Sequence, residues 1–207
     1  MTDTVVVVAG GSAPASRALE AIPPGAPVIA ADGGADHAIA LGLEIELAVG
    51  DFDSVTPATL ASLGDRVERH PVDKDATDLE LALRAALTLE PRRILVVGGV
   101  EGRLDHLFGE LIILGADELA GVEVDAVLGE ARIHVVRGER SLVGWEGELI
   151  SLFALHGPAE GIVTDGLRYP LRGEMLLPGS SRGISNMFAT SEARITVERG
   201  LLLAVRP

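Results

Sequence analysis

Short apolar runs alternate with helix-like segments along the first 130 residues of the chain. Runs at residues 4–9, 28–31, 45–49 and 93–97 are rich in Val, Ile, Leu and Ala. Continuous apolar runs of this length are typical of strands that are buried on both faces. The segments between them predict helices at residues 15–22, 35–41, 57–63, 79–87 and 107–114. Strands and helices that alternate in this way predict an α/β fold built on a parallel sheet.

The pattern changes near residue 130. Short apolar runs, separated by Gly, Pro and charged turns, lie at residues 133–136, 149–154, 161–164, 194–197 and 201–205. No long helical pattern is present there, which is typical of a small all-β domain. We therefore predict an α/β domain at residues 1–130 and an all-β domain at residues 131–207.

Composition narrows the class of protein. Hydrophobic residues make up 47% of the chain and aromatic residues only 3%, a mix that suits an α/β core. The absence of cysteine excludes disulfides and thiolate metal sites. No apolar run reaches the roughly 18 residues of a membrane span, and the first residues lack the basic flank of a signal peptide. We expect a cytoplasmic protein that does not bind membranes, and a net charge of −14 argues against a nucleic-acid groove.

Two aspartates directly follow the apolar run at residues 45–49. Asp51 and Asp53 come just after Gly50, so a strand that ends there places both carboxylates beyond its carboxyl end. Open α/β sheets bind their ligands at that edge. Nearby carboxylates repel each other, so the pair indicates a divalent cation, a basic partner or simple solvent exposure.

Further polar segments are predicted at the same edge of the sheet. They supply Asp32, Lys74, Thr77, Asp78, Arg103, Asp105 and His106. So many carboxylates repel strongly unless a cation lies among them, and oxygen ligands without cysteine or a histidine pair favour Mg²⁺. Lys74, the only lysine of the chain, and Arg103 are then placed to meet phosphate oxygens. Thr77 and Glu80 match a helix capping box, which adds backbone donors. The combination predicts phosphoryl transfer.

Simpler structural interpretations and other enzyme classes stay open at this point. Asp32 can shape a turn, Thr77 and Asp78 can cap a helix, and Asp105 can be an N-cap with His106 on the surface. Haloacid-dehalogenase-type phosphatases also carry D-x-D after a strand, but normally after the first one. Glycosyltransferases use D-x-D as well, yet lack the T-D and G-R-x-D-H segments. P-loop kinases are excluded because no G-x-x-x-x-G-K-[ST] is present.

Six segments together resemble the thiamine pyrophosphokinase family, in the family's order and spacing. Four lie in the predicted α/β part, at 31–34 (A-D-G-G), 50–54 (G-D-F-D-S), 74–78 (K-D-A-T-D) and 102–106 (G-R-L-D-H). Two lie in the β-rich part, at 166–171 (G-L-R-Y-P-L) and 181–186 (S-R-G-I-S-N). Each segment alone is a weak signal, whereas six in order are a strong one.

The resemblance implies an N-terminal α/β catalytic domain, a C-terminal β-sandwich domain and a homodimer with the thiamine site at the subunit interface. It implies a thiamine diphosphokinase, which uses Mg²⁺ to transfer the pyrophosphoryl group of ATP to thiamine, giving thiamine diphosphate and AMP. The expected catalytic carboxylates are Asp32, Asp51, Asp53 and Asp78, and the last three are the expected metal ligands. The expected contacts to the nucleotide and its phosphates are Lys74, Thr77, Arg103, Asp105 and His106. The expected thiamine contacts are Ser185 and Asn186.

One position departs from the family pattern, because Glu110 stands where the family usually has asparagine. This questions a nearby nucleotide contact but not the class of reaction. Asp32 is assigned no specific role, because it can support a metal ligand or contact the substrate. Two alternatives remain: a pyrophosphokinase with another hydroxymethyl heterocycle, such as a pterin, as acceptor, and a non-catalytic thiamine or nucleotide sensor. The intact acidic set argues against the sensor.

Overall fold

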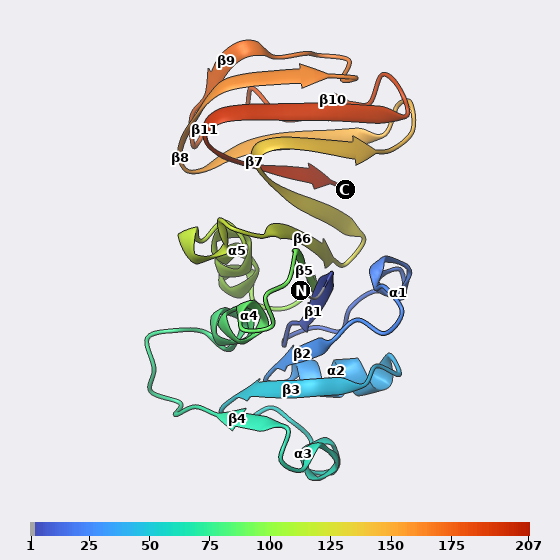
Figure 1. Ribbon diagram of the computed structural model, residues 1–207, viewed down its shortest axis with the longest axis vertical. Coiled ribbons are helices and arrows are strands. Elements are labelled where there is room, and N and C mark those ends of the chain that lie inside the picture. The colour runs from blue at the N-terminus through green and yellow to red at the C-terminus, as the bar shows by residue number, and fades with distance from the viewer. Residues whose placement is uncertain (1–2) are drawn as a thin grey trace. The chain divides into compact units, whose positions relative to one another are not determined.

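The computed structural model describes residues 3–207, so the first two residues of the predicted domain 1–130 lie outside it (Figure 1). The chain divides into two compact units. The first contains the residues up to Ile113 and Gly121–Glu130, and the second contains Leu114–Ala120 and Ala131–Pro207. Residues 114–120, which the sequence interpretation places in the first domain, thus group with the second unit. Within the described range, no helix is long and apolar enough to cross a membrane.

The first unit is a parallel sheet with helices in its connections. Its strands are β1 (Thr4–Val8), β2 (Val28–Ala31), β3 (Ile45–Gly50), β4 (Val67–Arg69), β5 (Arg93–Gly98) and β6 (Glu123–Leu128). Its helices are α1 (Ala18–Ala21), α2 (Gly34–Ala40), α3 (Pro57–Leu63), α4 (Asp78–Leu87) and α5 (Leu104–Ile113). The strand order is β6-β5-β1-β2-β3-β4, and each neighbouring pair is parallel. The predicted parallel α/β part is therefore confirmed.

Helix α4 shows how the sequence pattern positions the first turn of a helix against the sheet. Its apolar face is buried and packs against β1, β2 and β3. The hydroxyl of Thr77 caps the helix by accepting a hydrogen bond from the backbone N–H of Glu80 at 3.2 Å, as the sequence predicts. The Glu80 carboxylate pairs with Arg84 one turn further on. This cap fixes where Asp78 begins the helix.

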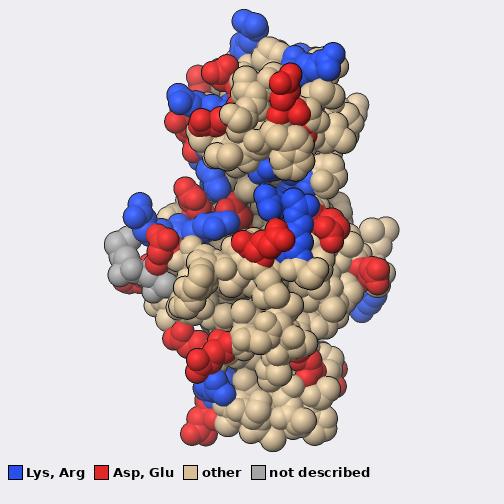
Figure 2. All heavy atoms as spheres, turned by 90° about the vertical axis from the view of Figure 1, so that its right-hand side faces the viewer, with Lys and Arg blue, Asp and Glu red and all other residues tan. Residues whose placement is uncertain are grey.

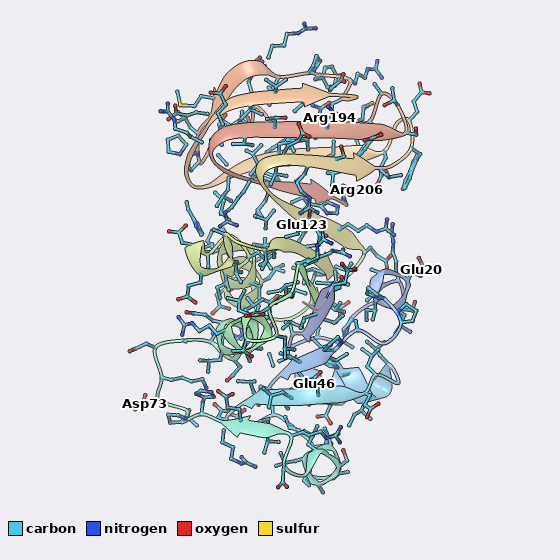
Figure 3. All side chains as sticks on the ribbon, in the orientation of Figure 1. Glu20, Glu46, Asp73, Glu123, Arg194 and Arg206 are labelled. Atoms are coloured by element: carbon cyan, nitrogen blue, oxygen red, sulfur yellow. The ribbon has the colours of Figure 1, made fainter. Side chains whose placement is uncertain are left out.

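The second unit is antiparallel. It contains a short 3₁₀ helix (Asp117–Leu119) and the strands β7 (Ala131–Val143), β8 (Leu149–Asp165), β9 (Arg172–Leu176), β10 (Asn186–Met187) and β11 (Glu192–Arg206). The order is β10-β8-β11-β7, with β9 paired to β8. Its core includes Phe188, Ile150 and Leu202. Arg206, which is labelled in Figure 3, lies near the end of β11. It forms a buried ion pair with Glu148. The predicted all-β part is confirmed.

The strands differ in length from the sequence prediction for physical reasons. The runs 194–197 and 201–205 belong to one strand, β11, which continues through a register shift. Gly200 lies at this irregularity with φ 83°, and a Cβ atom there would lie 2.3 Å from the carbonyl oxygen of Pro158. Strand β6 was not predicted because Asp125 interrupts its apolar run. Asp125 is buried in an ion pair with Arg93 at 2.6 Å.

Charged side chains of both signs lie on the surface of both units. On the face drawn in Figure 2, acidic and basic side chains are next to one another. Several form exposed ion pairs, such as Arg84–Glu80 and Arg182–Glu174. Exposed pairs of this kind are screened by water and contribute little to stability. The ion pairs Arg93–Asp125 and Arg206–Glu148 are less exposed to water, so this screening weakens them less.

Candidate functional site

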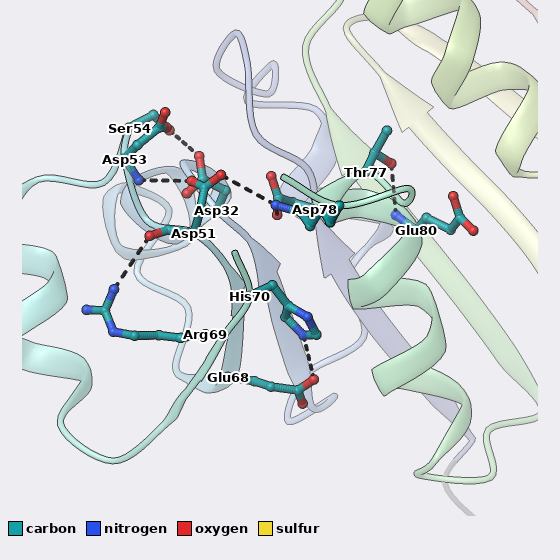
Figure 4. Close-up of polar contacts among 11 residues, drawn as sticks. Asp32, Asp51, Asp53, Ser54, Glu68, Arg69, His70, Thr77, Asp78 and Glu80 are labelled. Carbon is teal, nitrogen blue, oxygen red and sulfur yellow. Dashed lines mark hydrogen bonds and ion pairs between the residues drawn. The ribbon is translucent and has the colours of Figure 1, made fainter. Parts of the chain in front are cut away.

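Three carboxylates converge at the carboxyl ends of β2 and β3. One oxygen from each of Asp32, Asp51 and Asp78 lies within 4.8 Å of the other two. Asp32 follows β2, Asp51 follows β3, and Asp78 is the first residue of α4 (Figure 4). All three residues are partly buried. The structure thus brings together carboxylates that lie far apart in the sequence, at the sheet edge where parallel folds bind ligands. We call these three residues the carboxylate cluster.

Uncommon backbone conformations allow this convergence. Asp32 has φ 44° and Phe52 has φ 63°, values that non-glycine residues rarely adopt. Gly50 has φ 155°, and a Cβ atom there would lie 3.0 Å from Asp32 Cβ and 3.2 Å from Asp78 Oδ1. Glycine is therefore required for the close approach of the two loops and the helix. Strained backbone of this kind is often found at functional sites.

Among the described residues, two buried oxygens of the cluster, Asp32 Oδ1 and Asp78 Oδ1, accept no hydrogen bond, and of the two only Asp78 Oδ1 has an ion-pair partner, Lys74. The Ser54 hydroxyl donates to Asp32 Oδ2, and the backbone N–H of Asp53 donates to Asp51 Oδ1 at 3.1 Å. Asp32 Oδ1 is buried and has no hydrogen-bond partner. Buried polar atoms are normally satisfied, so this oxygen is a candidate ligand atom for a cation. Oxygen atoms in this number and arrangement suit a hard divalent cation.

Lys74 lies against the cluster. Its Nζ is 2.9 Å from Asp78 Oδ1 and 3.4 Å from Asp51 Oδ2, and its side chain is 13% exposed. Burial alone lowers the pKa of Lys74, but the hydrogen bond and charge of Asp78, followed by those of Asp51, raise it above its ordinary value. The ammonium group therefore remains charged and offsets part of the repulsion in the cluster. Lys74, the only lysine in the sequence, thus lies beside two of the three carboxylates.

Asp53 lies beside the cluster but outside the group of three. Its pKa is raised, chiefly by the negative charge of Asp51, then by desolvation and by Asp32 and Asp78. The predicted metal set is Asp51, Asp53 and Asp78, whereas the group that converges in space is Asp32, Asp51 and Asp78. Asp53 is exposed, and its raised pKa shows that its carboxylate is close enough to the cluster to be repelled by it.

The predicted residues near α5 form a surface group. The Arg103 guanidinium donates two hydrogen bonds to the Asp105 carboxylate, at 2.6 and 3.2 Å. This contact lowers the pKa of Asp105 to about 2. Both side chains are more than half exposed, and His106 lies in the first turn of α5. The guanidinium fork is therefore oriented by its own neighbour and presents its remaining N–H groups to solvent.

The two predicted thiamine contacts belong to the second unit and differ in their surroundings. Ser185 is exposed, with φ 59°. Asn186 is 5% exposed, and its amide oxygen accepts hydrogen bonds from the backbone N–H groups of Tyr169 and Met187 at 3.0 and 2.9 Å. Its amide nitrogen donates to the Tyr169 carbonyl at 2.8 Å. Ser185 is thus accessible, whereas Asn186 fixes the Tyr169 segment.

Sequence reasoning missed Asp36, which holds the start of α3 just after the Gly50–Ser54 loop. Asp36 on α2 accepts hydrogen bonds from the backbone and hydroxyl of Thr56, at 2.9 and 2.7 Å. Burial raises the pKa of Asp36, but hydrogen bonds from Thr59 and Thr56 outweigh it and lower the pKa. The position of Asp36 on a helix gives no local sequence signal for this role. Ser54, which donates to Asp32, does have a local sequence signal, because it ends the G-D-F-D-S segment.

Glu110, the residue that departs from the family pattern, has a raised pKa, so the stability of the protein should depend on pH. Desolvation raises the pKa of Glu110 from 4.5 to about 7. A raised pKa favours the protonated carboxyl in the folded state, so stability falls as pH rises from about 4.5 through about 7. We expect Glu110→Gln to raise the urea midpoint relative to the wild type at pH 8, with the difference vanishing near pH 4.5. Glu46→Gln, at an exposed position, is the control. An equal difference at both pH values would contradict this explanation.

The chain is similar to known proteins over most of its length. A family model described as the thiamin pyrophosphokinase catalytic domain matches residues 25–120, and one described as the thiamin pyrophosphokinase vitamin B1 binding domain matches residues 130–202. Thiamine pyrophosphokinase of Bacillus subtilis is 27% identical over 164 residues, covering 77% of each chain. Thiamine pyrophosphokinase 1 of Oryza sativa is 26% identical over 175 residues, covering 75% of this chain and 64% of the rice protein.

Solved structures agree with these matches. The crystal structure of thiamine pyrophosphokinase from Bacillus subtilis has a TM-score of 0.84 at 25% identity, covering 99% of this chain and 98% of that one. Thiamin pyrophosphokinase from Candida albicans has a TM-score of 0.78 at 13% identity, covering 99% of this chain and 89% of that one. The second similarity concerns the fold alone.

Proposed function

The chain belongs to the thiamin pyrophosphokinase family, and we propose that it transfers the pyrophosphoryl group of ATP to the hydroxyl of thiamine. The products are thiamine diphosphate and AMP. The observation that carries the proposal is the carboxylate cluster, which lies inside the region matched by the catalytic domain of the family. The second unit carries the match to the vitamin B1 binding domain. We further propose two domains with a boundary near residue 130 and a cytoplasmic location.

The carboxylate cluster fits Mg²⁺. Its donors are all oxygens, and the buried Asp32 Oδ1 lacks a partner. We assign Asp51, Asp53 and Asp78 to the metal, and the convergence in space adds Asp32 to this set. When bound, Mg²⁺ would neutralise phosphate charge and help to align the reacting groups. The cluster itself repels phosphate, so a cation between the two is required on electrostatic grounds.

Positive charge and backbone donors are placed beside the cluster for the nucleotide. Lys74 brings its ammonium group to the rim of the cluster. The N-terminus of α4, capped by Thr77, offers backbone N–H groups and the positive end of the helix dipole. We assign the phosphate and nucleotide contacts to these residues together with Arg103, Asp105 and His106. Asp105 orients the Arg103 guanidinium for such a contact.

The reaction needs the hydroxyl oxygen of thiamine in line with the bond that breaks. This oxygen attacks the β-phosphorus of ATP, and the bond from that phosphorus to the oxygen bridging the α-phosphorus breaks. AMP leaves with the bridging oxygen, and the hydroxyl proton is released, with a carboxylate of the cluster as its acceptor. We propose that Ser185 contacts thiamine, that Asn186 shapes the same site, and that the site is completed in a homodimer.

Release of AMP tests the proposal directly. We expect AMP to form from ATP and Mg²⁺ only when thiamine is added, in step with thiamine diphosphate. AMP that forms with a hydroxymethylpterin but not with thiamine would change the acceptor. ADP or free phosphate would indicate a simple kinase or a phosphatase. A folded protein that binds thiamine but releases no AMP would be a sensor.

A further inference from the structure

The loop Gly50–Ser54 has a backbone conformation that requires support from outside the loop. Phe52 adopts φ 63°, which is unfavourable for a bulky side chain. Its side chain is 6% exposed and packs in the core of the first unit. The two carboxylates Asp51 and Asp53 flank it in the sequence. The direction of the Asp51 carboxylate therefore depends on how firmly Phe52 is held.

Strand β4 provides this support from the edge of the sheet. Gly50 pairs with Arg69 in the parallel register of β3 and β4, and the backbone N–H of His70 donates to the Gly50 carbonyl at 2.9 Å. The Arg69 guanidinium carbon lies 4.9 Å from the centre of the Phe52 ring. Its Nη1 makes a long hydrogen bond of 3.5 Å to the Asp51 carbonyl (Figure 4). Arg69 thus contacts two successive residues of the loop through one planar group.

We propose that Arg69 is a positioning residue, which holds the Gly50–Ser54 loop in the conformation that presents Asp51 to a divalent cation. The proposal rests on the cation site proposed above. Arg69 lies in none of the six segments that resemble the family. The cation–π contact orients the Phe52 ring, and the long hydrogen bond restrains the Asp51 carbonyl. Partners of this kind, which orient a ligand without touching the metal, affect metal affinity strongly.

The charge of Arg69 and its positioning role predict opposite changes in cation affinity when the side chain is removed. A guanidinium near a carboxylate cluster repels a cation, so removing it would strengthen cation binding if Arg69 acted only through its charge. If Arg69 positions Asp51, removing it weakens cation binding. The two roles are therefore distinguished by the direction of a single change.

The test measures binding of Mn²⁺ alone to the full chain, from the free Mn²⁺ signal in electron paramagnetic resonance. We expect Arg69→Ala and Arg69→Lys to weaken Mn²⁺ binding by about tenfold. The lysine variant keeps the charge but loses the planar group that contacts both loop residues. The control is Arg92→Ala, which removes the same charge at an exposed position at the amino end of β5, away from the cluster edge. It should bind Mn²⁺ like the wild type.

Turnover provides a second readout. We expect Arg69→Ala to need about ten times more Mg²⁺ for half-maximal rate, with the KM for ATP unchanged at saturating Mg²⁺. If Arg69→Ala does not fold, Phe52→Leu replaces it, because leucine stays buried but removes the ring that the guanidinium contacts. Where both variants and the double variant fold, the losses of Mn²⁺ binding free energy should be less than additive, because the two substitutions remove the same contact.

Several outcomes would overturn the role of Arg69. Equal or tighter Mn²⁺ binding by Arg69→Ala would do so, and so would wild-type binding by Arg69→Lys. A higher KM for ATP with unchanged Mn²⁺ affinity would mean that Arg69 contacts the phosphates instead. Absence of Mn²⁺ binding by the wild type would overturn the cation site itself, and the role of Arg69 with it.

Discussion

Asp51→Asn is expected to lower turnover by more than about a hundredfold, because residues that merely orient metal ligands already cost 10- to 100-fold when they are changed. The asparagine keeps the shape of the side chain and one oxygen but removes the charge that a divalent cation requires. The backbone N–H of Asp53 can still donate to the remaining oxygen. The loss should appear in kcat measured as thiamine-dependent AMP release at saturating ATP.

The same variant should remain folded. Asp51 is the largest cause of the raised pKa of Asp53, so the charge of Asp51 is repelled in the absence of a cation. Removing it relieves this repulsion, and Lys74 keeps its contact with Asp78 at 2.9 Å. We therefore expect a thermal midpoint without metal that is equal to or above that of the wild type. It should also gain less stability from added Mg²⁺ than the wild type does.

Asp73→Asn is the matched control for this experiment. Asp73 is an exposed carboxylate next to Lys74, and it lies outside the carboxylate cluster. The substitution removes one negative charge from the same edge of the sheet. It should leave kcat within about twofold, since exposed charges are screened by water. Unchanged turnover in a folded Asp51→Asn protein would remove Asp51 from the proposed metal site.

Local sequence patterns were sufficient for the elements that present the cluster. The apolar runs located β2 and β3, and the residues that follow them are Asp32 and the Asp51 loop. Thr77 was identified as a helix cap from its spacing to Glu80, and its hydroxyl does accept that hydrogen bond. These features depend on residues within a few positions of each other, which is the range over which strand and helix patterns operate.

Features that depend on distant partners could not be read from the sequence. Asp32 joins the cluster through a left-handed backbone conformation and a hydrogen bond from Ser54, 22 residues away. Asp125 interrupts the pattern of β6 because it pairs with Arg93, 32 residues away. Nothing near Arg69 in the sequence indicates that it contacts Phe52. Each of these contacts is set by tertiary packing, which overrides local propensity.

Arg206→Ala is expected to cost about 3–5 kcal/mol of unfolding free energy, because it leaves the Glu148 carboxylate buried without its charged partner. The side chains of Arg206 and Glu148 are only 5% and 7% exposed, and Arg206 Nη2 and Nε lie 2.6 and 2.8 Å from Glu148 Oε1. The guanidinium also lies 5.3 Å from the centre of the Phe188 ring. A loss of this size is a large part of the total stability of a typical domain.

Glu148 also holds the turn that carries Trp145, the only tryptophan in the sequence, so Trp145 fluorescence can report on the ion pair. Glu148 Oε2 accepts a hydrogen bond from the backbone N–H of Trp145 at 3.2 Å. Urea unfolding followed by Trp145 fluorescence should therefore show the loss directly. Arg182→Ala, which breaks the exposed pair with Glu174, is the control and should have little effect. A double variant, Arg206→Met with Glu148→Gln, should recover part of the loss because no uncompensated charge remains. If Arg206→Ala lowered the unfolding free energy no more than Arg182→Ala does, the Arg206–Glu148 pair would not stabilise the second unit.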